Sequence, residues 1–223
     1  PNSSKELILS GPHFFVGRPL YKTPRNPCTL NSHYDVLDLT TLPEDYLPRT
    51  NYVPDCSSEE YDKRTPKVPW ETTESGVTER KKVTEFYRLC FRAMLSQSGE
   101  RTLIGALLPK HFGHVNAAQT VMFKNNISLL NLTSLSLSTV ADFYIKSTGK
   151  ANLHYIWESL ADLSCAVDYV ANRLRLNGLL LNSLTIGYCE LWSDCWDSQY
   201  SAQQWAKSDP RLPSSFFTNL TST

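Results

Sequence analysis

"ERTLIGALLPKHFGHVNAAQTVMF", residues 100–123, places two apolar runs on either side of a polar turn. The first run, residues 103–108, ends at Pro109, whose fixed φ and missing N–H are typical of a strand end. The second run lies around residues 121–123. Four side chains between them can donate hydrogen bonds: Lys110, His111, His114 and Asn116. This pattern predicts two strands joined either by a plain surface turn or by a loop that presents donors to a ligand.

The composition is that of a soluble globular protein. The 223 residues are 41% hydrophobic and 20% charged, and a chain of this length can bury one sizeable core or two small ones. The longest apolar run is far shorter than the ~20 residues that a membrane-spanning helix needs. The chain begins at Pro1 without a signal peptide, which indicates a fragment of a longer, cytoplasmic protein. The formal net charge is zero, whereas nucleic-acid-binding domains are usually basic.

The six cysteines lack the short spacings of a disulfide scaffold or a zinc site. Cys90 and Cys165 fall on apolar stripes of predicted helices, so we expect both to be reduced thiols in the core. His111 and His114 could place two imidazoles on one face, but a metal site needs three or four ligands, and no further ligand lies at a familiar spacing. The sequence therefore predicts no disulfide framework and no metal site.

Residues 19–70 are rich in proline, which fixes φ and removes a ladder donor. This part is therefore expected to be an extended arm with isolated short strands and without long helices. Aromatic and cationic residues alternate along it, beginning with Tyr21, Lys22 and Arg25. Two interpretations stay open: the tyrosines pack the arm against a core, or the aromatic and cationic side chains face a ligand.

Four later segments have helical patterns. Residues 79–95 show one apolar stripe, made of Val83, Phe86, Tyr87, Cys90, Phe91 and Met94. Residues 127–145 predict a second helix, which buries Leu129, Leu130, Leu137, Val140, Ala141 and Tyr144. A third has a stripe at Leu163, Ala166, Val167, Val170, Ala171 and Leu174 and is expected to end at Asn177-Gly178. Residues 179–206 are predicted to be helical again, with Trp192, Trp196 and Trp205 as packing anchors. Up to about residue 160 the chain thus mixes strands and helices, and beyond it only helices are expected.

No motif for catalysis or for cofactor binding occurs in the chain. The glycines are dispersed without a Gly-x-Gly, so no backbone cradle for a phosphate is predicted, and there is no Gly-x-Ser-x-Gly elbow for a nucleophile. Adenine methyltransferases hold the target amine with an Asp/Asn/Ser-Pro-Pro-aromatic motif. Asn26-Pro27-Cys28 and Asp209-Pro210-Arg211 both lack its second proline and its aromatic residue. The chain itself is therefore expected to be non-catalytic, with no catalytic and no cofactor-binding residue.

Several phrases of the sequence resemble one family. They are "GRPLYKTPRNPC" (17–28), "LPRTNYVP" (47–54), "RTPKVPW" (64–70), "ERTLIGALLPKHFGHVNA" (100–117), "VADFYIKSTGKANLH" (140–154) and "DPRLP" (209–213). These segments are similar to the C-terminal half of large bacterial N6-adenine DNA methyltransferases of restriction-modification and phage-defence systems, where they follow the catalytic domain. The similarity spans most of residues 10–213.

The resemblance implies a target-recognition, or specificity, region that reads DNA bases. A separate catalytic domain of the same parent chain would bind S-adenosylmethionine and flip the adenine, so no cofactor is expected in this chain. The implied fold is α+β, with a small curved sheet and packed helices over residues 76–160. A proline-rich extended arm (1–75) precedes it and a helical tail (161–223) follows. Double-stranded DNA and the catalytic domain are the implied partners.

In such specificity regions, loops and strand edges enter the DNA grooves. The turn after Pro109 therefore becomes a candidate loop for reading bases or phosphates, and the polar segment around Gly149 becomes a second. The candidate DNA-binding residues are Lys22, Arg25, Lys110, His111, His114, Asn116, Lys146, Thr148, Lys150, Asn152 and His154.

Two other kinds of function remain to be weighed against DNA recognition. An interaction or scaffold domain of the same defence enzyme is favoured by the zero net charge and by the tryptophan-rich helical tail. An independent enzyme has no motif to support it. Binding to DNA through several phosphates must weaken steeply with salt, and this property separates the first two functions.

Overall fold

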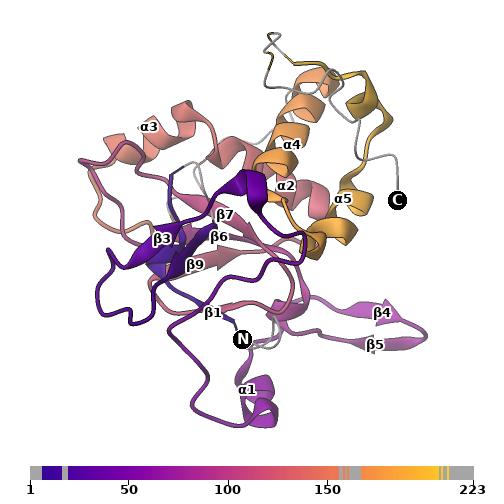
Figure 1. The fold of residues 1–223 in the computed structure, drawn as a ribbon. Coiled ribbons are helices and arrows are strands. Elements are labelled where there is room, and N and C mark those ends of the chain that lie inside the picture. The colour runs from indigo at the N-terminus through magenta and orange to yellow at the C-terminus, as the bar shows by residue number, and fades with distance from the viewer. Residues whose placement is uncertain are drawn as a thin grey trace.

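The computed structural model describes residues 7–16, 20–155, 158, 160, 167–205, 207 and 210, and these form an α+β fold, as the sequence predicts (Figure 1). The strands are β1 (Ile8–Leu9), β2 (Lys22–Pro24), β3 (Tyr34–Val36), β4 (Thr72–Glu74), β5 (Val77–Glu79), β6 (Arg88–Arg92), β7 (Gly105–Leu108), β8 (Gly113–His114) and β9 (Ala118–Val121). The α-helices are α1 (Ser58–Arg64), α2 (Asn126–Ser136), α3 (Thr139–Ser147), α4 (Asp168–Asn182) and α5 (Cys189–Cys195).

The centre of the fold is a three-stranded antiparallel sheet in the order β7-β6-β9. The predicted strands on either side of Pro109 are present as β7 and β9, although β6 lies between them, so they do not form a hairpin with each other. The turn that joins them contains β8, which pairs in parallel with β1 near the N-terminus. The hairpins β2–β3 and β4–β5 form two further sheets, and β4–β5 projects from the body of the molecule together with α1 (Figure 1).

The central strand β6 is buried on both faces. Leu89 and Phe91 point into the larger core, which also contains Leu107 and residues of α2, α3, α4 and α5. Cys90 points to the opposite face, where Leu7, Leu9, Phe14 and Phe112 complete a second core. Segments from the expected arm and from the expected helical tail therefore cover the two faces of one sheet. The boundaries predicted for the three parts of the chain remain a prediction.

The predicted helix over residues 79–95 is wrong, because this segment forms the end of β5, a short 3-10 turn over Val83–Glu85, and β6. The spacing of apolar residues distinguishes a short buried strand from a buried helix poorly, and the segment Tyr87–Phe91, apolar except for Arg88, fits both. The segment forms a strand because it has a hydrogen-bonded strand on each side: Leu89 pairs with Leu107 of β7 and with Val121 of β9. Cys90 is nevertheless a buried thiol, as predicted.

The single helix predicted over residues 127–145 is divided into α2 and α3. Ser138 begins α3 as its N-cap, with its Oγ accepting from the Ala141 N–H at 3.0 Å. Arg101 lies at the junction and donates to the carbonyl oxygens at the end of α2, including that of Leu137 at 3.2 Å. The division turns Val140 and Tyr144 outward, so only Leu129, Leu130 and Ala141 of the six predicted stripe residues are fully buried.

The helix expected to end at Asn177-Gly178 continues to Asn182. A Cβ on Gly178 would lie 2.5 Å from Ser134 Oγ of α2, so this glycine permits close contact between two helices and does not terminate α4. Ala171 is buried, whereas Val167 and Val170 are exposed. Leu163 and Ala166 of the predicted stripe lie outside the described residues, as does Cys165, which was predicted to be a core thiol.

Residues 179–206 are helical only in part, through the end of α4, the short helix α5 and two 3-10 turns. Trp192 packs against the larger core, as predicted. Trp196 and Trp205 are exposed, and Trp196 makes an edge-on contact with Tyr200 at 5.7 Å between ring centroids. Trp192 therefore packs on the core as predicted, whereas Trp196 and Trp205 keep more than a third of their surface exposed.

His13 joins two parts of the arm, the segment around Ser10 and the segment around Arg49. Its buried ring accepts a hydrogen bond at Nδ1 from the Ser10 N–H (3.1 Å) and donates from Nε2 to the Arg49 carbonyl oxygen (2.8 Å). Burial is the largest influence on this group and lowers the pKa of His13 below its ordinary value of 6.5. The folded state therefore favours the neutral form of the His13 ring.

We expect this arrangement to make stability depend on pH. The unfolded chain takes up the His13 proton at a higher pH than the folded chain does. The contribution of His13 is therefore fully present above pH 6.5 and is lost as the pH falls from there towards the lower pKa of the folded state. Denaturant unfolding at a series of pH values measures this, and the variant His13→Gln, which cannot titrate, should show a weaker dependence. Equal pH dependence in the two proteins would contradict the assignment.

Candidate nucleic-acid interface

The predicted polar turn is divided between the two ends of the sheet. Strand β6 begins at Arg88, opposite Leu108 at the end of β7, and finishes at Arg92, opposite Ala118 at the start of β9. Lys110 follows β7 and so lies near the Arg88 end, whereas Asn116 precedes β9 and lies at the Arg92 end. Five strand residues span roughly 13 Å. Side chains that are close in sequence are therefore held apart in space.

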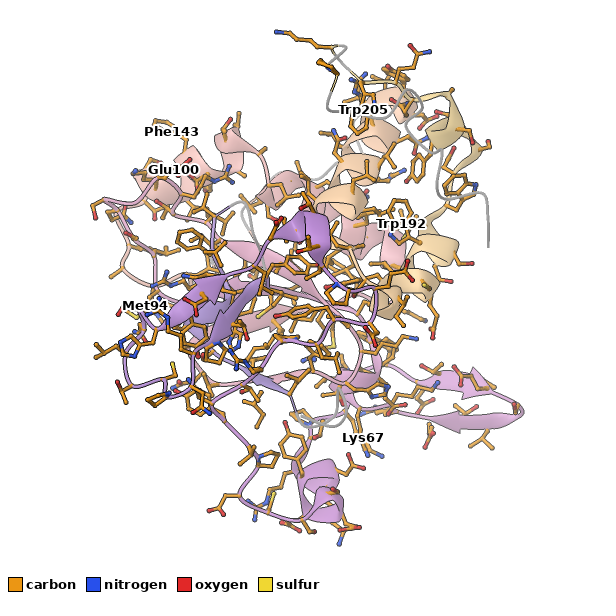
Figure 2. The ribbon with its side chains drawn as sticks, in the orientation of Figure 1. Lys67, Met94, Glu100, Phe143, Trp192 and Trp205 are labelled. Carbon is orange, nitrogen blue, oxygen red and sulfur yellow. The ribbon has the colours of Figure 1, made fainter. Side chains whose placement is uncertain are left out.

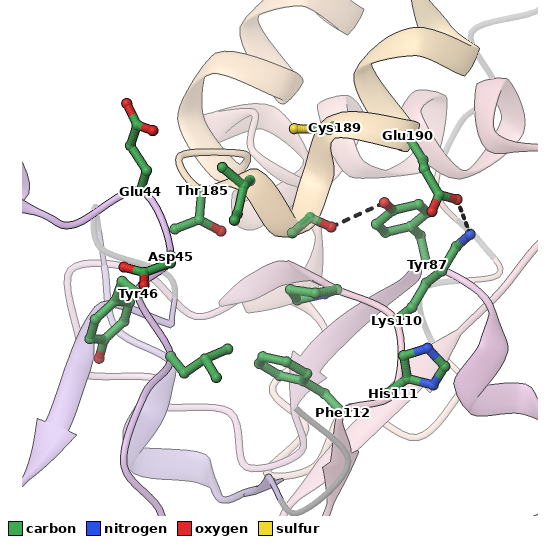
Figure 3. Close-up of a pocket in the computed structure, with 14 residues that line it drawn as sticks. Glu44, Asp45, Tyr46, Tyr87, Lys110, His111, Phe112, Thr185, Cys189 and Glu190 are labelled. Carbon is green, nitrogen blue, oxygen red and sulfur yellow. Dashed lines mark hydrogen bonds and ion pairs between the residues drawn. The ribbon is translucent and has the colours of Figure 1, made fainter. Parts of the chain in front are cut away.

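At the Arg88 end, Lys110 lines a pocket of about 540 Å³ (Figure 3). Its ammonium forms an ion pair with Glu190 and lies 5.3 Å from the centroid of the Tyr87 ring. The pocket is also lined by two further acidic residues, Glu44 and Asp45. A cation that already has a carboxylate partner, in a lining where acids outnumber lysines, is a poor position for binding phosphate.

The two histidines of the turn have structural contacts. His111 lies in the same pocket with a φ of 73°, and its N–H donates to the Thr84 carbonyl oxygen at 2.6 Å. His114 is half-buried, and its Nδ1 lies 3.0 Å from the Val115 carbonyl oxygen while Nε2 lies 3.0 Å from Thr120 Oγ1. Burial lowers the pKa of His114. Its neutral ring is thus hydrogen-bonded within the fold at both nitrogens.

Two of the candidates around Gly149 also serve the fold. Lys146 Nζ donates to the Gly99 carbonyl oxygen at 3.2 Å, which joins α3 to the loop before β7. Thr148 Oγ1 donates to the Ile145 carbonyl oxygen at 2.7 Å at the end of α3. In contrast, Lys150, Asn152 and His154 are exposed and lie on the segment that follows.

Five residues from four chain segments lie at the other end of the sheet, and we call this surface the Arg92 edge. Residues 93–95 continue from β6 and are hydrogen-bonded to two other chain segments. The Ala93 N–H donates to the Ala117 carbonyl oxygen at 2.9 Å, and Met94 forms an isolated bridge with Asn152. Lys22 of β2 is close enough for the charge of Arg92 to act on it. The Arg92 edge consists of Lys22, Arg92, Met94, Asn116 and Asn152.

The charge at the Arg92 edge is positive and only partly compensated. Burial, followed by the neighbouring guanidinium of Arg92, lowers the pKa of Lys22, and its ammonium lies 4.4 Å from the centroid of the Phe15 ring. Arg25, on the same hairpin, is paired with Asp35 at 2.7 Å. Within the described part of the chain, Arg92 has no ion pair. Lys22 likewise forms no ion pair with another described residue. Two adjacent cations without a paired acid favour the binding of an anion.

The structure therefore brings together three of the predicted residues, Lys22, Asn116 and Asn152, and separates them from Lys110 and His111. In Figure 2, Met94 lies on one side of the molecule, and Lys67 and Trp192 lie on the other. Sequence reasoning missed Arg92 and Met94 because it placed both on a helix. The apolar residues Phe91, Ala93 and Leu95 at every second position are the sequence signal for a strand that could have identified them. In the structure these three residues are buried and Met94 is exposed.

No protein-family model, curated protein or solved structure matches this chain. In the described ranges, no group of three or more His, Cys, Asp or Glu residues is placed to hold a metal ion. The same residues contain no helix that is both long enough and apolar enough to cross a membrane.

Proposed function

We propose that this chain binds double-stranded DNA through the Arg92 edge, as the target-recognition region of an N6-adenine DNA methyltransferase of a restriction-modification or phage-defence system. The catalytic domain of the same parent polypeptide would bind S-adenosylmethionine and transfer the methyl group. The chain would locate the site and position the duplex. The cytoplasm is the compartment in which such an enzyme would meet DNA.

The observation that carries the proposal is the convergence at the Arg92 edge of two cations with two exposed amide side chains. Cations that reach phosphates provide affinity, and amides that reach base edges provide specificity. A formal net charge of zero is compatible with DNA binding at the Arg92 edge, because acidic residues such as Glu44, Asp45 and Glu190 lie at the opposite, Arg88 end of the sheet. The positive potential that DNA meets is local.

The proposal predicts a specific response to salt and to two substitutions. Arg92→Ala and Lys22→Ala are each expected to weaken duplex binding by about tenfold or more at low salt, since a hydrogen bond to a charged group contributes about 1.5–3 kcal/mol. Removing one cation that touches a phosphate should also flatten the slope of log affinity against log salt by about 0.9. Fluorescence anisotropy with a labelled duplex, titrated at several salt concentrations, measures both effects.

Lys124→Ala and Lys110→Ala are the matched controls. Lys124 is an exposed lysine just beyond β9, at the Arg88 end of the sheet, and Lys110 is paired there with Glu190. Each control removes one positive charge from the chain without touching the Arg92 edge, so affinity and salt slope should stay near those of the unmodified chain. Equal losses in all four variants would mean that only total charge matters, and that the Arg92 edge is not the interface.

A scaffold function within the same defence enzyme is the second candidate. It is favoured by an exposed apolar stripe on α3, where Val140 and Phe143 are 78% and 73% exposed and Tyr144 lies beside them. A contiguous exposed apolar surface commonly marks a protein contact. The salt titration separates the two functions, because a scaffold domain would show no duplex binding even at low salt.

A further inference from the structure

A pocket of about 450 Å³ lies beside the start of β7, at the Arg92 end of the sheet. Gly105, the first residue of β7, lines it and is paired with Phe91, the neighbour of Arg92. Binding sites for small ligands have volumes of about 300–1,000 Å³ and mostly apolar linings. We call this cavity the Phe15 pocket, and its apolar side chains are Phe15, Val16, Leu103, Ile104, Leu137 and Leu181.

Two contacts join the Phe15 pocket to the Arg92 edge. The Arg92 N–H donates to the carbonyl oxygen of Ile104 at 2.9 Å. The ammonium of Lys22 lies over the Phe15 ring, 4.4 Å from its centroid. Figure 2 shows Glu100, another residue of the lining, on the same side of the molecule as Met94. The pocket therefore adjoins the two cations to which the proposed function assigns phosphate contacts.

The apolar part of the lining suits a nucleobase. Phe15 is 43% exposed and Leu181 is 59% exposed, so both offer apolar surface to a ligand. Aromatic side chains bind unstacked bases by stacking, and cations next to them follow the sugar-phosphate backbone. An aromatic ring with an ammonium 4.4 Å from its centroid, beside an apolar cavity, provides both kinds of contact for one nucleotide.

The polar part of the lining suits the edge of a base better than a phosphate. Glu100 and Thr139 line the pocket and are exposed. The Arg101 guanidinium, also in the lining, already donates to carbonyl oxygens at the end of α2. A carboxylate and a hydroxyl are thus the side-chain groups left for a ligand. A base that has left its pair presents N–H donors on its Watson–Crick edge, which a carboxylate can accept.

We propose that the Phe15 pocket binds one nucleobase that has left the stack of the DNA held at the Arg92 edge. Phe15 stacks against the base, and Lys22 contacts the phosphate of the same nucleotide. This inference rests on the proposed function, and it adds a site for an unstacked base within this chain. The site is separate from the one in which the catalytic domain of the parent polypeptide would hold its target adenine.

Binding to duplexes with and without one bulged base tests the inference. Taking a base out of the stack costs least when it is unpaired. The unmodified chain is therefore expected to bind the bulged duplex more tightly than the fully paired one, by about 5- to 150-fold, the factor that stacking of one base on an aromatic ring provides. Fluorescence anisotropy with the two labelled duplexes measures this preference.

Three variants assign the preference to the pocket. Phe15→Ala should remove most of it. Leu181→Trp fills the pocket and leaves Lys22 in place, so it should abolish the preference while the affinity for the paired duplex stays unchanged. Phe143→Ala is the matched control, because Phe143 is an exposed phenylalanine on α3 outside the lining, and it should keep the full preference. Melting curves should be similar for the three variants, since all three side chains are partly or largely exposed.

The possible outcomes separate the pocket from the proposed function. If the chain binds duplex DNA with a steep salt dependence but binds bulged and paired duplexes equally, the base assignment is overturned and the proposed function stands. The same holds if Leu181→Trp keeps the preference for the bulged duplex. If the unmodified chain binds neither duplex at low salt, both are overturned, and the apolar side chain of a protein partner becomes the better occupant of the pocket.

Discussion

Phe91→Ala is expected to lower the free energy of unfolding by about 3–5 kcal/mol. Phe91 is fully buried on the central strand β6, within the larger core. Its ring lies directly over Gly105 of the neighbouring strand, where an added Cβ would be 2.9 Å from two ring carbons. Removing the ring would leave a cavity between the sheet and the helices that cannot close without moving a strand paired on both sides. The loss would be a large part of the stability of an ordinary domain, which is about 5–15 kcal/mol.

Denaturant unfolding followed by circular dichroism measures this loss. Phe143→Ala is the matched control, because Phe143 lies on α3 with 73% of its surface exposed and is labelled at the outer side of the molecule in Figure 2. A surface substitution of this kind should change stability by only about 0.5 kcal/mol. Similar losses for the two phenylalanines would show that β6 is not the central strand of the core.

Asp142→Ala is the second substitution for which we expect a large effect. Asp142 is buried on α3, and its Oδ1 accepts from the Thr102 N–H at 2.8 Å and from the Leu103 N–H at 2.6 Å. The same oxygen lies 3.4 Å from Arg101 Nε. Alanine would leave two backbone donors without their acceptor and would remove the carboxylate that faces the Arg101 charge. Breaking a buried charge pair in this way costs about 3–5 kcal/mol.

Comparing Asp142→Asn with Asp142→Ala separates the loss of the negative charge from the loss of the hydrogen-bond acceptor as causes of the destabilisation. Asp142→Asn keeps an oxygen that can accept a hydrogen bond but removes the negative charge, so its stability should lie between those of the unmodified chain and Asp142→Ala. Asp45→Ala, at an exposed aspartate, should change the free energy of unfolding by only about 0.5 kcal/mol. If Asp142→Ala unfolds at the same denaturant concentration as Asp45→Ala, Asp142 is not the link between α3 and the loop before β7.

Several features of this protein are determined by the sequence alone. The apolar run before Pro109 and the run around Val121 predict β7 and β9, because proline ends a ladder and the flanking residues suit a buried sheet. The prolines of residues 19–70 likewise allow only short elements, and the described residues there form β2, β3, the seven-residue helix α1 and one 3-10 turn. These signals act within a few residues, so they can be read from the sequence.

Other features depend on partners that are distant in the chain. Tyr87–Phe91 becomes a strand because β7 and β9 supply hydrogen bonds on both sides and cores form on both faces. The segment 127–145 becomes two helices because Arg101 and Asp142 join the junction to the loop before β7. The local spacing of apolar residues predicts neither the strand pairing nor the helix junction, because both depend on contacts with residues far away in the sequence.

The candidate site shows the same division. The sequence, through its resemblance to DNA methyltransferases, makes Lys22, Asn116 and Asn152 candidates for DNA contact, and it places Lys110 only six residues before Asn116. The tertiary structure separates that pair, because the chain crosses from one end of β6 to the other between them. It also brings Lys22, Asn116 and Asn152 from three segments to Arg92 and Met94. Residue type is a local property that the sequence states directly, whereas the juxtaposition of residues follows from strand register, which backbone hydrogen bonds between distant segments establish.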